Sequence, residues 1–461
     1  MSNRNGRFQG GHRDIGSRGR FVVARSLFTV AAALSGAAQA DSATASPEQD
    51  SPIFRGFQTS SVFQNAPPFP ASYSGPGSFR SDQSLSHLIT AYFGASITKR
   101  LQVYANGEVY YGRGISDMSG LGSEPNGDSI RAGAVLPKKP YLARAYVRYT
   151  HELSDATRPV TPGWDEVRKT EPTSSLQFKA GKFSPIDDFD RNRYANSARS
   201  QFLNWGLMVN TAWDLASDTR AYSDGAVFSL NFPTWAFRSG FFAVPTTANG
   251  PKLGSSFRTG RGDNYELELS PVPGGPVVRM LAYRNIAPMG IWRNAIAAAA
   301  PGTAPDISVD RRDGHKKYGY ALNLEWPLAD DGETGFFARH GWNDGRTEMW
   351  GFADAEKHFS IGMQISGVRW RRADDRIGLG WVRGGASSDH LDYLALGGRG
   401  LFVGDGAIQR AREYVFEAYY RYQLTKYVQL TPDYQRLINP GYNSARGPIN
   451  IFGLRLRIHY D

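Results

Sequence analysis

The chain has 461 residues, of which 41% are hydrophobic and 21% charged, and its formal net charge is +10. It contains no Cys, which excludes disulfide bonds, thiolate catalysis and Cys-based zinc sites. It also has no run of about 18 or more apolar residues, which excludes a protein that crosses a membrane with helices. The mean hydropathy of -0.43 still allows a transmembrane β-barrel, because apolar and polar residues alternate along barrel strands.

Residues 1–40 have the features of a secretory signal peptide. Six Arg precede an apolar stretch at residues 27–34, and Ala38-Gln39-Ala40 offers small residues for cleavage. The alternatives are a basic tail that binds nucleic acid and a misassigned start codon. Cleavage after Ala40 would remove six Arg and one Asp and lower the net charge from +10 to +5. Half of the net positive charge would then belong to the signal peptide and would give no information about the binding partners of the mature protein.

The remaining chain is expected to form one domain. Residues 41–52 are rich in Ser, Pro and acidic residues and are expected to be a flexible periplasmic segment. Residues 53–461 consist of short alternating stretches separated by Gly, Pro, Asp, Asn and Ser clusters. This pattern predicts an all-β fold, a transmembrane antiparallel barrel.

The C-terminal stretch gives the clearest alternation. One face carries Phe452, Leu454, Leu456, Ile458 and Tyr460, and the opposite face carries Gly453, Arg455, Arg457 and His459. An apolar stripe opposite a basic face, ending in an aromatic residue, is typical of the last strand of an outer-membrane barrel. The aromatic residue usually stands last in such proteins, whereas here Asp461 follows it.

Sixteen strands are predicted, and their number is supported by the lengths of the connections. In bacterial barrels both termini are periplasmic, and short periplasmic turns alternate with long outer loops. This rule assigns residues 205–213 to a loop, although they alternate, and leaves only the long turn at 151–174 as an exception. The predicted strands are 53–64, 88–98, 101–111, 141–150, 175–183, 223–232, 235–244, 263–270, 277–286, 316–326, 334–343, 358–367, 375–384, 412–424, 428–437 and 449–460.

Strand parity also predicts which polar side chains face the lumen. Arg offers a rigid fork of donors, carboxylates accept hydrogen bonds from hydroxyl groups, and tyrosine rings stack on apolar sugar faces. Any one of these charges could instead only solvate the wall, since barrel lumens are generally polar. The candidate pore-lining and sugar-contacting residues are Arg144, Arg148, Glu325, Arg339, Glu417, Arg421, Arg455 and Arg457, and parity adds Glu108, Tyr146 and Tyr419 to the lumen face.

The loop that begins at Ser184 is the longest and holds a dense charged stretch. We expect it either to fold into the pore as a constriction or to remain outside as a solvated lid. Its acidic residues lack the Gly and the late Glu of a calcium loop, and the eight His are scattered, so no metal and no cofactor is predicted. The candidate constriction residues are Asp187, Asp188, Asp190, Arg191 and Arg193.

Enzymatic motifs are lacking in the sequence. It has no Gly-x-Ser-x-Gly elbow, no phosphate loop and no His-Glu-x-x-His pair. A hydrolase can assemble its site from separated strands, so catalysis is disfavoured rather than excluded.

Several stretches together resemble the carbohydrate-selective, OprB-like porins of Gram-negative bacteria. They are Lys317 to Glu325, Phe337 to Glu348, Ser388 to Ala395, Gly404-Asp405-Gly406, Glu417 to Tyr422 and Thr431 to Gln435 with Asn439-Pro440. The resemblance extends from about Phe54 to Tyr460, including Gly181-Lys182-Phe183 and Phe202 to Trp205. It implies a sixteen-stranded barrel with an Arg-rich narrowing that passes glucose and related sugars, often as a monomer. The long 151–174 turn and the terminal Asp461 depart from the family pattern.

The resulting hypothesis is an outer-membrane porin that allows passive diffusion of small carbohydrates. Its expected partners are sugar solutes, outer-membrane lipid and the barrel-assembly machinery, with no nucleic acid, and a monomer is favoured over a trimer. The alternatives are a barrel that binds surface polysaccharide, one that passes small polar solutes without sugar preference, and a barrel enzyme. The preferred sugar is not determined by the sequence.

Overall fold

The structure is a computed structural model that describes residues 52–131, 136–352 and 355–460. The predicted signal peptide, residues 41–51 of the predicted flexible segment and Asp461 lie outside the described residues. Among the described residues no helix has the length and apolar character that a membrane crossing requires.

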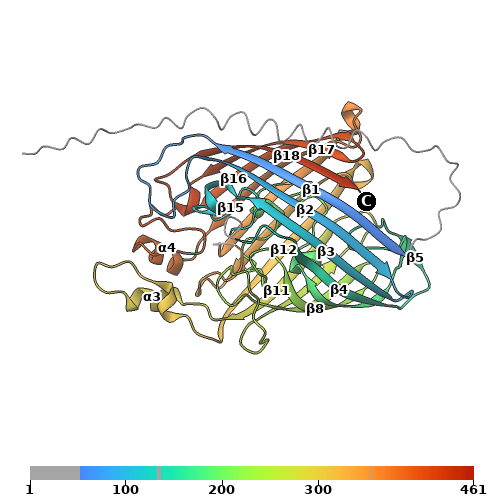
Figure 1. Cartoon of the computed structure of the whole chain (residues 1–461), viewed down its shortest axis with the longest axis horizontal. Coiled ribbons are helices and arrows are strands. Elements are labelled where there is room, and N and C mark those ends of the chain that lie inside the picture. Colours follow the sequence, from blue (N-terminus) through green and yellow to red (C-terminus); the bar gives the residue numbers. More distant parts are fainter. Residues whose placement is uncertain (1–51, 132–135, 353–354, 461) are drawn as a thin grey trace, which may run out of the picture. The chain divides into compact units, whose positions relative to one another are not determined.

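Sixteen antiparallel strands close into a barrel (Figure 1), which confirms the predicted fold. Each strand pairs with its neighbours in sequence, and β1 closes the barrel on β18, with Phe57 opposite Tyr460. The strands are β1 (Ile53–Ala66), β2 (Asp82–Ser96), β3 (Leu101–Gly112), β4 (Tyr141–Glu152), β7 (Ser175–Phe183), β8 (Ser223–Asn231), β9 (Trp235–Ala243), β10 (Arg261–Leu269), β11 (Val277–Ala287), β12 (His315–Ala329), β13 (Thr334–Asn343), β14 (Lys357–Ser366), β15 (Arg376–Gly385), β16 (Glu413–Thr425), β17 (Val428–Ile438) and β18 (Ile449–Tyr460).

The predicted strand boundaries agree with these to within about three residues, except at β2. That strand begins at Asp82 rather than at residue 88, because Asp82 to His87 extend the ladder with β1 and pair as far as Ala66. Residues 205–213 are not a strand, as predicted, and include the short helix α2 (Trp205–Met208).

Short turns and long loops lie at opposite ends of the barrel. The short-turn end also holds both ends of the barrel sequence, so it is the periplasmic end. The 153–174 turn at this end carries a small separate hairpin of β5 (Thr157–Pro159) and β6 (Thr170–Pro172). The long-loop end carries α3 (Trp292–Ala298) and α4 (Ser388–Ala395), opposite to β5 and the C-terminus (Figure 1). The described 3₁₀ helices are η1 (Ile115–Met118), η2 (Pro185–Asp187), η3 (Ile307–Asp310), η4 (Asp330–Gly332), η5 (Gly367–Trp370) and η6 (Pro440–Tyr442).

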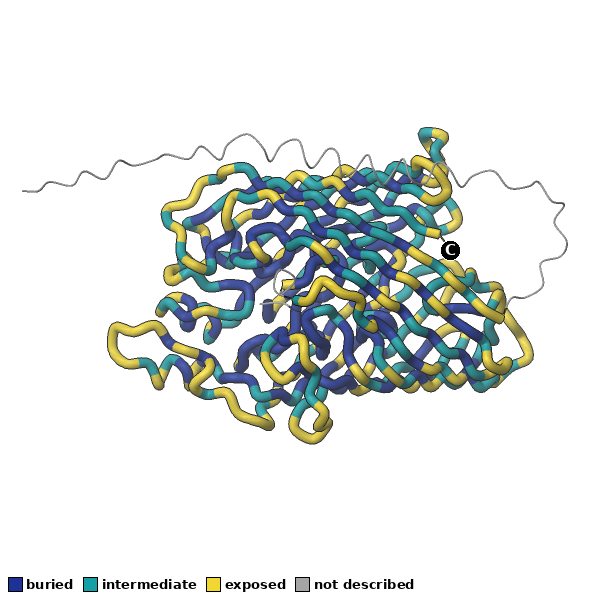
Figure 2. Tube along the Cα trace, viewed as in Figure 1, coloured by how far each residue is buried: buried dark blue, intermediate teal, exposed yellow. Residues whose placement is uncertain are grey.

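Side-chain exposure alternates along the strands, as Figure 2 shows for the barrel wall. On β12, Tyr320, Leu322 and Trp326 are exposed, whereas Asn323 and Glu325 are buried inside the barrel. Because the outer face meets lipid, exposed apolar side chains are stabilised there and polar ones are turned inward. The wall therefore has an apolar exterior and a polar interior.

Candidate functional site: the pore and its inward loop

Residues 184–222, which connect β7 to β8, fold into the barrel; we refer to them as the inward loop. Its first anchor is a bidentate ion pair with the wall, in which Arg144 Nε and Nη2 lie 2.8 and 2.7 Å from the Asp187 carboxylate. Burial alone raises the pKa of Asp187, but the Arg144 guanidinium outweighs it, so the pKa lies below the ordinary Asp value. Asp188 forms a second link, with Lys179 at 2.9 Å.

A second anchor lies across the lumen on β12 and β13. Asp190 accepts hydrogen bonds from Asn323 at 2.6 Å and from Arg339 at 3.2 Å. Arg339 also donates to the backbone carbonyls of Leu207 and Ala195. The loop reaches towards the periplasmic end here, because Arg193 pairs with Glu333 in the turn that follows β12.

Further contacts hold the loop against β16 and β18. The Glu417 carboxylate accepts from the backbone N–H groups of Leu203 and Asn204 at 2.6 and 2.9 Å. Arg455 donates to the carbonyls of Ala198 and Gln201, and Arg421 donates to that of Ser200. These side chains satisfy backbone groups of an irregular segment that would otherwise be buried without partners.

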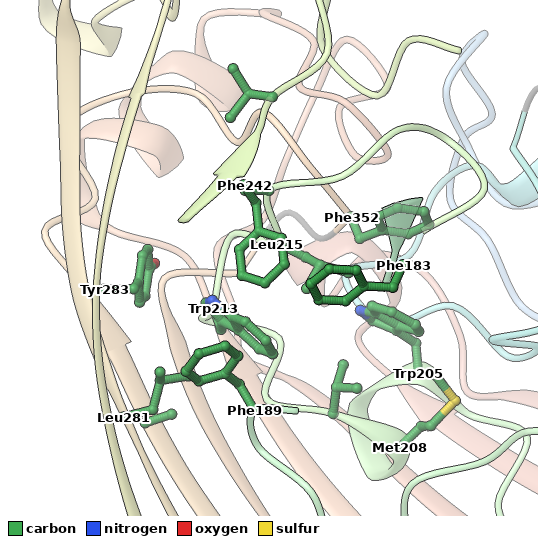
Figure 3. Close-up of a cluster of buried hydrophobic side chains, with 14 of the residues drawn as sticks. Phe183, Phe189, Trp205, Met208, Trp213, Leu215, Phe242, Leu281, Tyr283 and Phe352 are labelled. Atoms are coloured by element: carbon green, nitrogen blue, oxygen red, sulfur yellow. The ribbon is translucent and has the colours of Figure 1, made fainter. Parts of the chain in front are cut away.

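The loop also has its own hydrophobic core inside the barrel, shown in Figure 3. Phe189, Trp205 and Trp213 of the loop pack with wall residues Phe242 and Leu281, in a cluster that also holds Phe183, Met208, Leu215, Tyr283 and Phe352. A second cluster joins Phe202 and Leu207 to inward-facing apolar residues Phe337, Val382 and Val415. Burial of this apolar surface stabilises the inward position of the loop.

Two wall glycines allow the loop to approach the strands closely. A Cβ atom at Gly341 would overlap the side chain of Asn210, and a Cβ at Gly380 would overlap Leu207. Both positions face inward, on β13 and β15. Small residues are therefore required where the loop docks.

A cavity of about 730 Å³ remains beside the loop. Its barrel-strand residues come from β1–β4, β9–β12 and β18, and none of the described residues of β13–β17 borders it. Arg158 of the β5 hairpin also borders it. The inward loop thus fills the β13–β17 side of the barrel and displaces the cavity to the other side.

Most charges on the cavity wall are paired. Arg199 bridges Glu108 and Asp128, and Arg279 bridges Glu268 and Glu325. Arg191 and Arg220 differ from these residues, because in the described chain neither forms an ion pair with a carboxylate. Arg220 lies over the ring of Tyr141, 4.6 Å from its centroid. These two guanidinium groups remain available for hydrogen bonds with a solute.

The long periplasmic turn also reaches the cavity. The Trp164 ring borders it and lies 4.4 Å from the Arg144 guanidinium carbon. Glu166 holds the turn in place through ion pairs with Arg148 at 2.8 Å and Arg168 at 3.0 Å. Burial alone raises the pKa of Glu166, but the two guanidinium groups outweigh burial and lower it below its ordinary value.

The predicted lumen residues all point inward, but they divide into two groups. Arg144, Glu325 and Arg457 border the cavity, as do Asp187, Arg191 and Arg193 of the loop. Arg339, Glu417 and Arg455 are at most 1% exposed and lie behind the inward loop. The expectation that these three line the open pore is corrected: they anchor the loop. Arg148, Arg421, Asp188 and Asp190 also do not border the cavity.

Other cavity residues were not predicted. Arg238, Glu268 and Arg279 face inward by the same strand alternation, which could have identified them. Trp164, Arg199 and Arg220 lie in loops, where no periodicity predicts direction. Within the described residues no group of three or more His, Asp or Glu side chains could hold a metal ion.

A closed sixteen-stranded barrel with an apolar exterior, a polar interior cavity and an inward loop defines an outer-membrane porin. Residues 82–460 match the family described as "Carbohydrate-selective porin, OprB family", and the chain belongs to this family.

The barrel fold is similar to that of a solved structure. The high-pH structure of Pseudomonas putida OprB is 15% identical, with a TM-score of 0.67, and the match covers 88% of this chain and 94% of that one. The outer-membrane channel DcaP of Acinetobacter baumannii is 10% identical, with a TM-score of 0.48 and coverage of 88% and 97%. None of the curated proteins matches this chain.

Proposed function

We propose that this porin passes glucose and related small sugars by passive diffusion through the cavity beside the inward loop. The observation that carries the proposal is the joint placement of aromatic rings and free guanidinium groups on the cavity wall. Trp164 and Tyr141 border the cavity with rings that lie against the Arg144 and Arg220 guanidinium groups, and Arg191 and Arg220 offer donors. Sugars have apolar ring faces and many hydroxyl groups, so both kinds of contact suit them.

The wall charges support a neutral solute over a strongly charged one. Most arginines on the wall are already paired with carboxylates, which reduces the net field in the cavity. Paired groups still keep unused hydrogen-bonding positions for hydroxyl groups. No covalent step and no cofactor is part of this function.

The test is single-channel conductance in planar bilayers with glucose or maltose added. Open channels that sugar partly blocks are expected, with a Trp164→Ala variant showing a block weaker by about fivefold, since packing of an apolar sugar face on one aromatic ring is worth about 1 kcal/mol. Trp370→Ala is the matched control, because Trp370 lies in a periplasmic turn and not on the cavity. Silent bilayers would favour a polysaccharide-binding barrel, and open channels that sugar leaves unaffected would favour a pore without sugar preference.

We further propose that the protein acts as a monomer and is inserted by the barrel-assembly machinery. Support for the first point is the resemblance to OprB-like porins, which implies a monomer. Native mass spectrometry of the detergent-solubilised protein tests it, and a trimer would contradict it.

A further inference from the structure

We propose that the outer surface of the barrel carries a binding site for a phosphate-bearing lipid headgroup of the outer leaflet. The site is a groove of about 480 Å³ on the outside of β12–β15 and the segment that precedes β16, at the long-loop end, roofed by Ser388 and Leu391 at α4. We refer to it as the rim groove. It is separate from the pore, because no residue is shared by the two cavities.

The rim groove is strongly cationic. Lys357, Arg383, Arg410 and Arg412 border it, and none of the described residues along its wall is Asp or Glu. Arg410 pairs with Asp392 at 2.8 Å. In the described part of the chain, Lys357, Arg383 and Arg412 form no ion pair and are exposed. Three positive charges thus face outward without a protein counter-charge.

The positions of these cations match the level of lipid headgroups. Lys357 is the first residue of β14, Arg412 immediately precedes β16, and Arg383 stands two residues from the end of β15. The cost of a charge on the lipid face of a barrel is greatest at the membrane midplane and smallest near the interface. The cations therefore lie near one of the two membrane interfaces, where charges on the lipid face are tolerated and where anionic headgroups lie.

A belt of aromatic side chains fixes this level independently. Tyr320 and Trp342 border the groove, with ring centroids 5.9 Å apart. Below the cations, Trp381 stacks on Tyr414 at 5.8 Å and contacts Phe359 at 6.1 Å. Aromatic girdles mark the membrane interface of barrels. Further towards the barrel middle, exposed Ile361 and Leu379 present apolar surface for acyl chains.

The ligand chemistry follows from this arrangement. Lys and Arg bind phosphate oxygens through charge-assisted hydrogen bonds, and Arg can do so with two parallel bonds. The ring faces of Tyr320 and Trp342 suit a sugar in the same headgroup. A phosphorylated glycolipid fills all three requirements, with phosphate on the cations, sugar on the rings and acyl chains on the apolar wall.

The test measures lipid binding by the folded, detergent-solubilised barrel using native mass spectrometry. The probes are lipid A, the same lipid after removal of its phosphates, and inorganic phosphate. We expect lipid A to bind, the dephosphorylated lipid to bind at least tenfold more weakly, and inorganic phosphate neither to bind detectably nor to displace lipid A. The variant Lys357→Gln/Arg383→Gln/Arg412→Gln is expected to lose affinity for lipid A by tenfold or more, since each cation near an anionic surface contributes about a fivefold factor.

The matched control is Lys99→Gln/Lys316→Gln/Lys426→Gln, which removes the same charge from exposed positions outside the groove. It should bind lipid A like the wild type, and both variants should keep the difference in electrophoretic mobility between unboiled and boiled samples that marks a folded barrel. Equal lipid A affinity in the groove variant and the wild type would overturn the proposal. Binding that does not depend on the lipid phosphates, or displacement of lipid A by inorganic phosphate alone, would also overturn it.

Discussion

Arg144 of β4 and Asp187 of the inward loop form a bidentate ion pair, with donor–acceptor distances of 2.8 and 2.7 Å, that joins the barrel wall to the start of the loop. The Trp164 ring covers the same guanidinium from the periplasmic side. The wall, the inward loop and the long periplasmic turn therefore meet at one residue. All three residues border the cavity, so we expect substitutions here to change its width.

Asp187→Asn should loosen the inward loop. The substitution leaves the buried Arg144 without its counter-charge, which typically costs about 3–5 kcal/mol of stability. We expect a lower urea midpoint in refolding experiments and more open-channel noise in planar bilayers. Arg80→Gln is the control, because its ion pair with Asp117 is exposed and away from the cavity, and such pairs contribute about 0–1 kcal/mol. Equal effects of the two substitutions would contradict the anchoring role.

Arg339→Met should release the middle of the loop. Arg339 is fully buried and donates to the Asp190 carboxylate and to the backbone carbonyls of Asp190, Ala195 and Leu207, so its removal leaves four acceptors with fewer donors. We expect a larger and more variable single-channel conductance, because the loop would no longer fill the β13–β17 side. A channel of unchanged size would show that the apolar clusters alone hold the loop.

Arg191→Gln should act on selectivity and not on stability. Arg191 is exposed on the cavity wall and forms no ion pair in the described chain. Removing this charge lowers the local attraction for anions, which shifts the reversal potential in a salt gradient towards cation preference. The urea midpoint should match the wild type. A reversal potential identical to that of the wild type would place Arg191 outside the conduction path.

Gly341→Val should displace the loop without changing any charge. The new side chain would occupy the space of Asn210, which donates to the carbonyl of His340. We expect altered conductance and a lowered urea midpoint. Gly107→Val serves as the control, because a Cβ at Gly107 has no atom within 4 Å. Equal behaviour of the two variants would mean that the close docking at β13 is not required.

Acidification should protonate Glu166 and so weaken the ion pairs that hold the periplasmic turn to Arg148. Because its folded pKa lies below the unfolded value of about 4.3, its contribution to stability is present above that value and is lost as pH falls through the folded pKa. We expect conductance to rise or become noisier between neutral pH and about pH 3. Glu166→Gln should already show the change at pH 7 and respond less to acid. An equal response to acid in both proteins would assign the effect to other carboxyl groups.

The alternating pattern of the strands was sufficient to predict most of the fold. Sixteen strands and the division between short turns and long loops followed from the sequence, because the membrane imposes one rule on every strand: apolar side chains outward and polar ones inward. The inward direction of Arg144, Arg339 and Arg455 followed from the same rule. The early start of β2 did not, since its first residues pair with β1 above the membrane, where that rule is weak.

What only the tertiary structure decided is which inward side chains reach the open cavity. Arg339 and Arg457 have the same parity, yet Arg339 is covered by the inward loop and Arg457 borders the pore. The path of residues 184–222 depends on long-range packing of Phe189, Trp213 and Phe202 against distant strands, which has no local periodicity. The direction of side chains along a strand is a local property that repeats every two residues. The docking of the inward loop depends instead on contacts between residues more than a hundred positions apart.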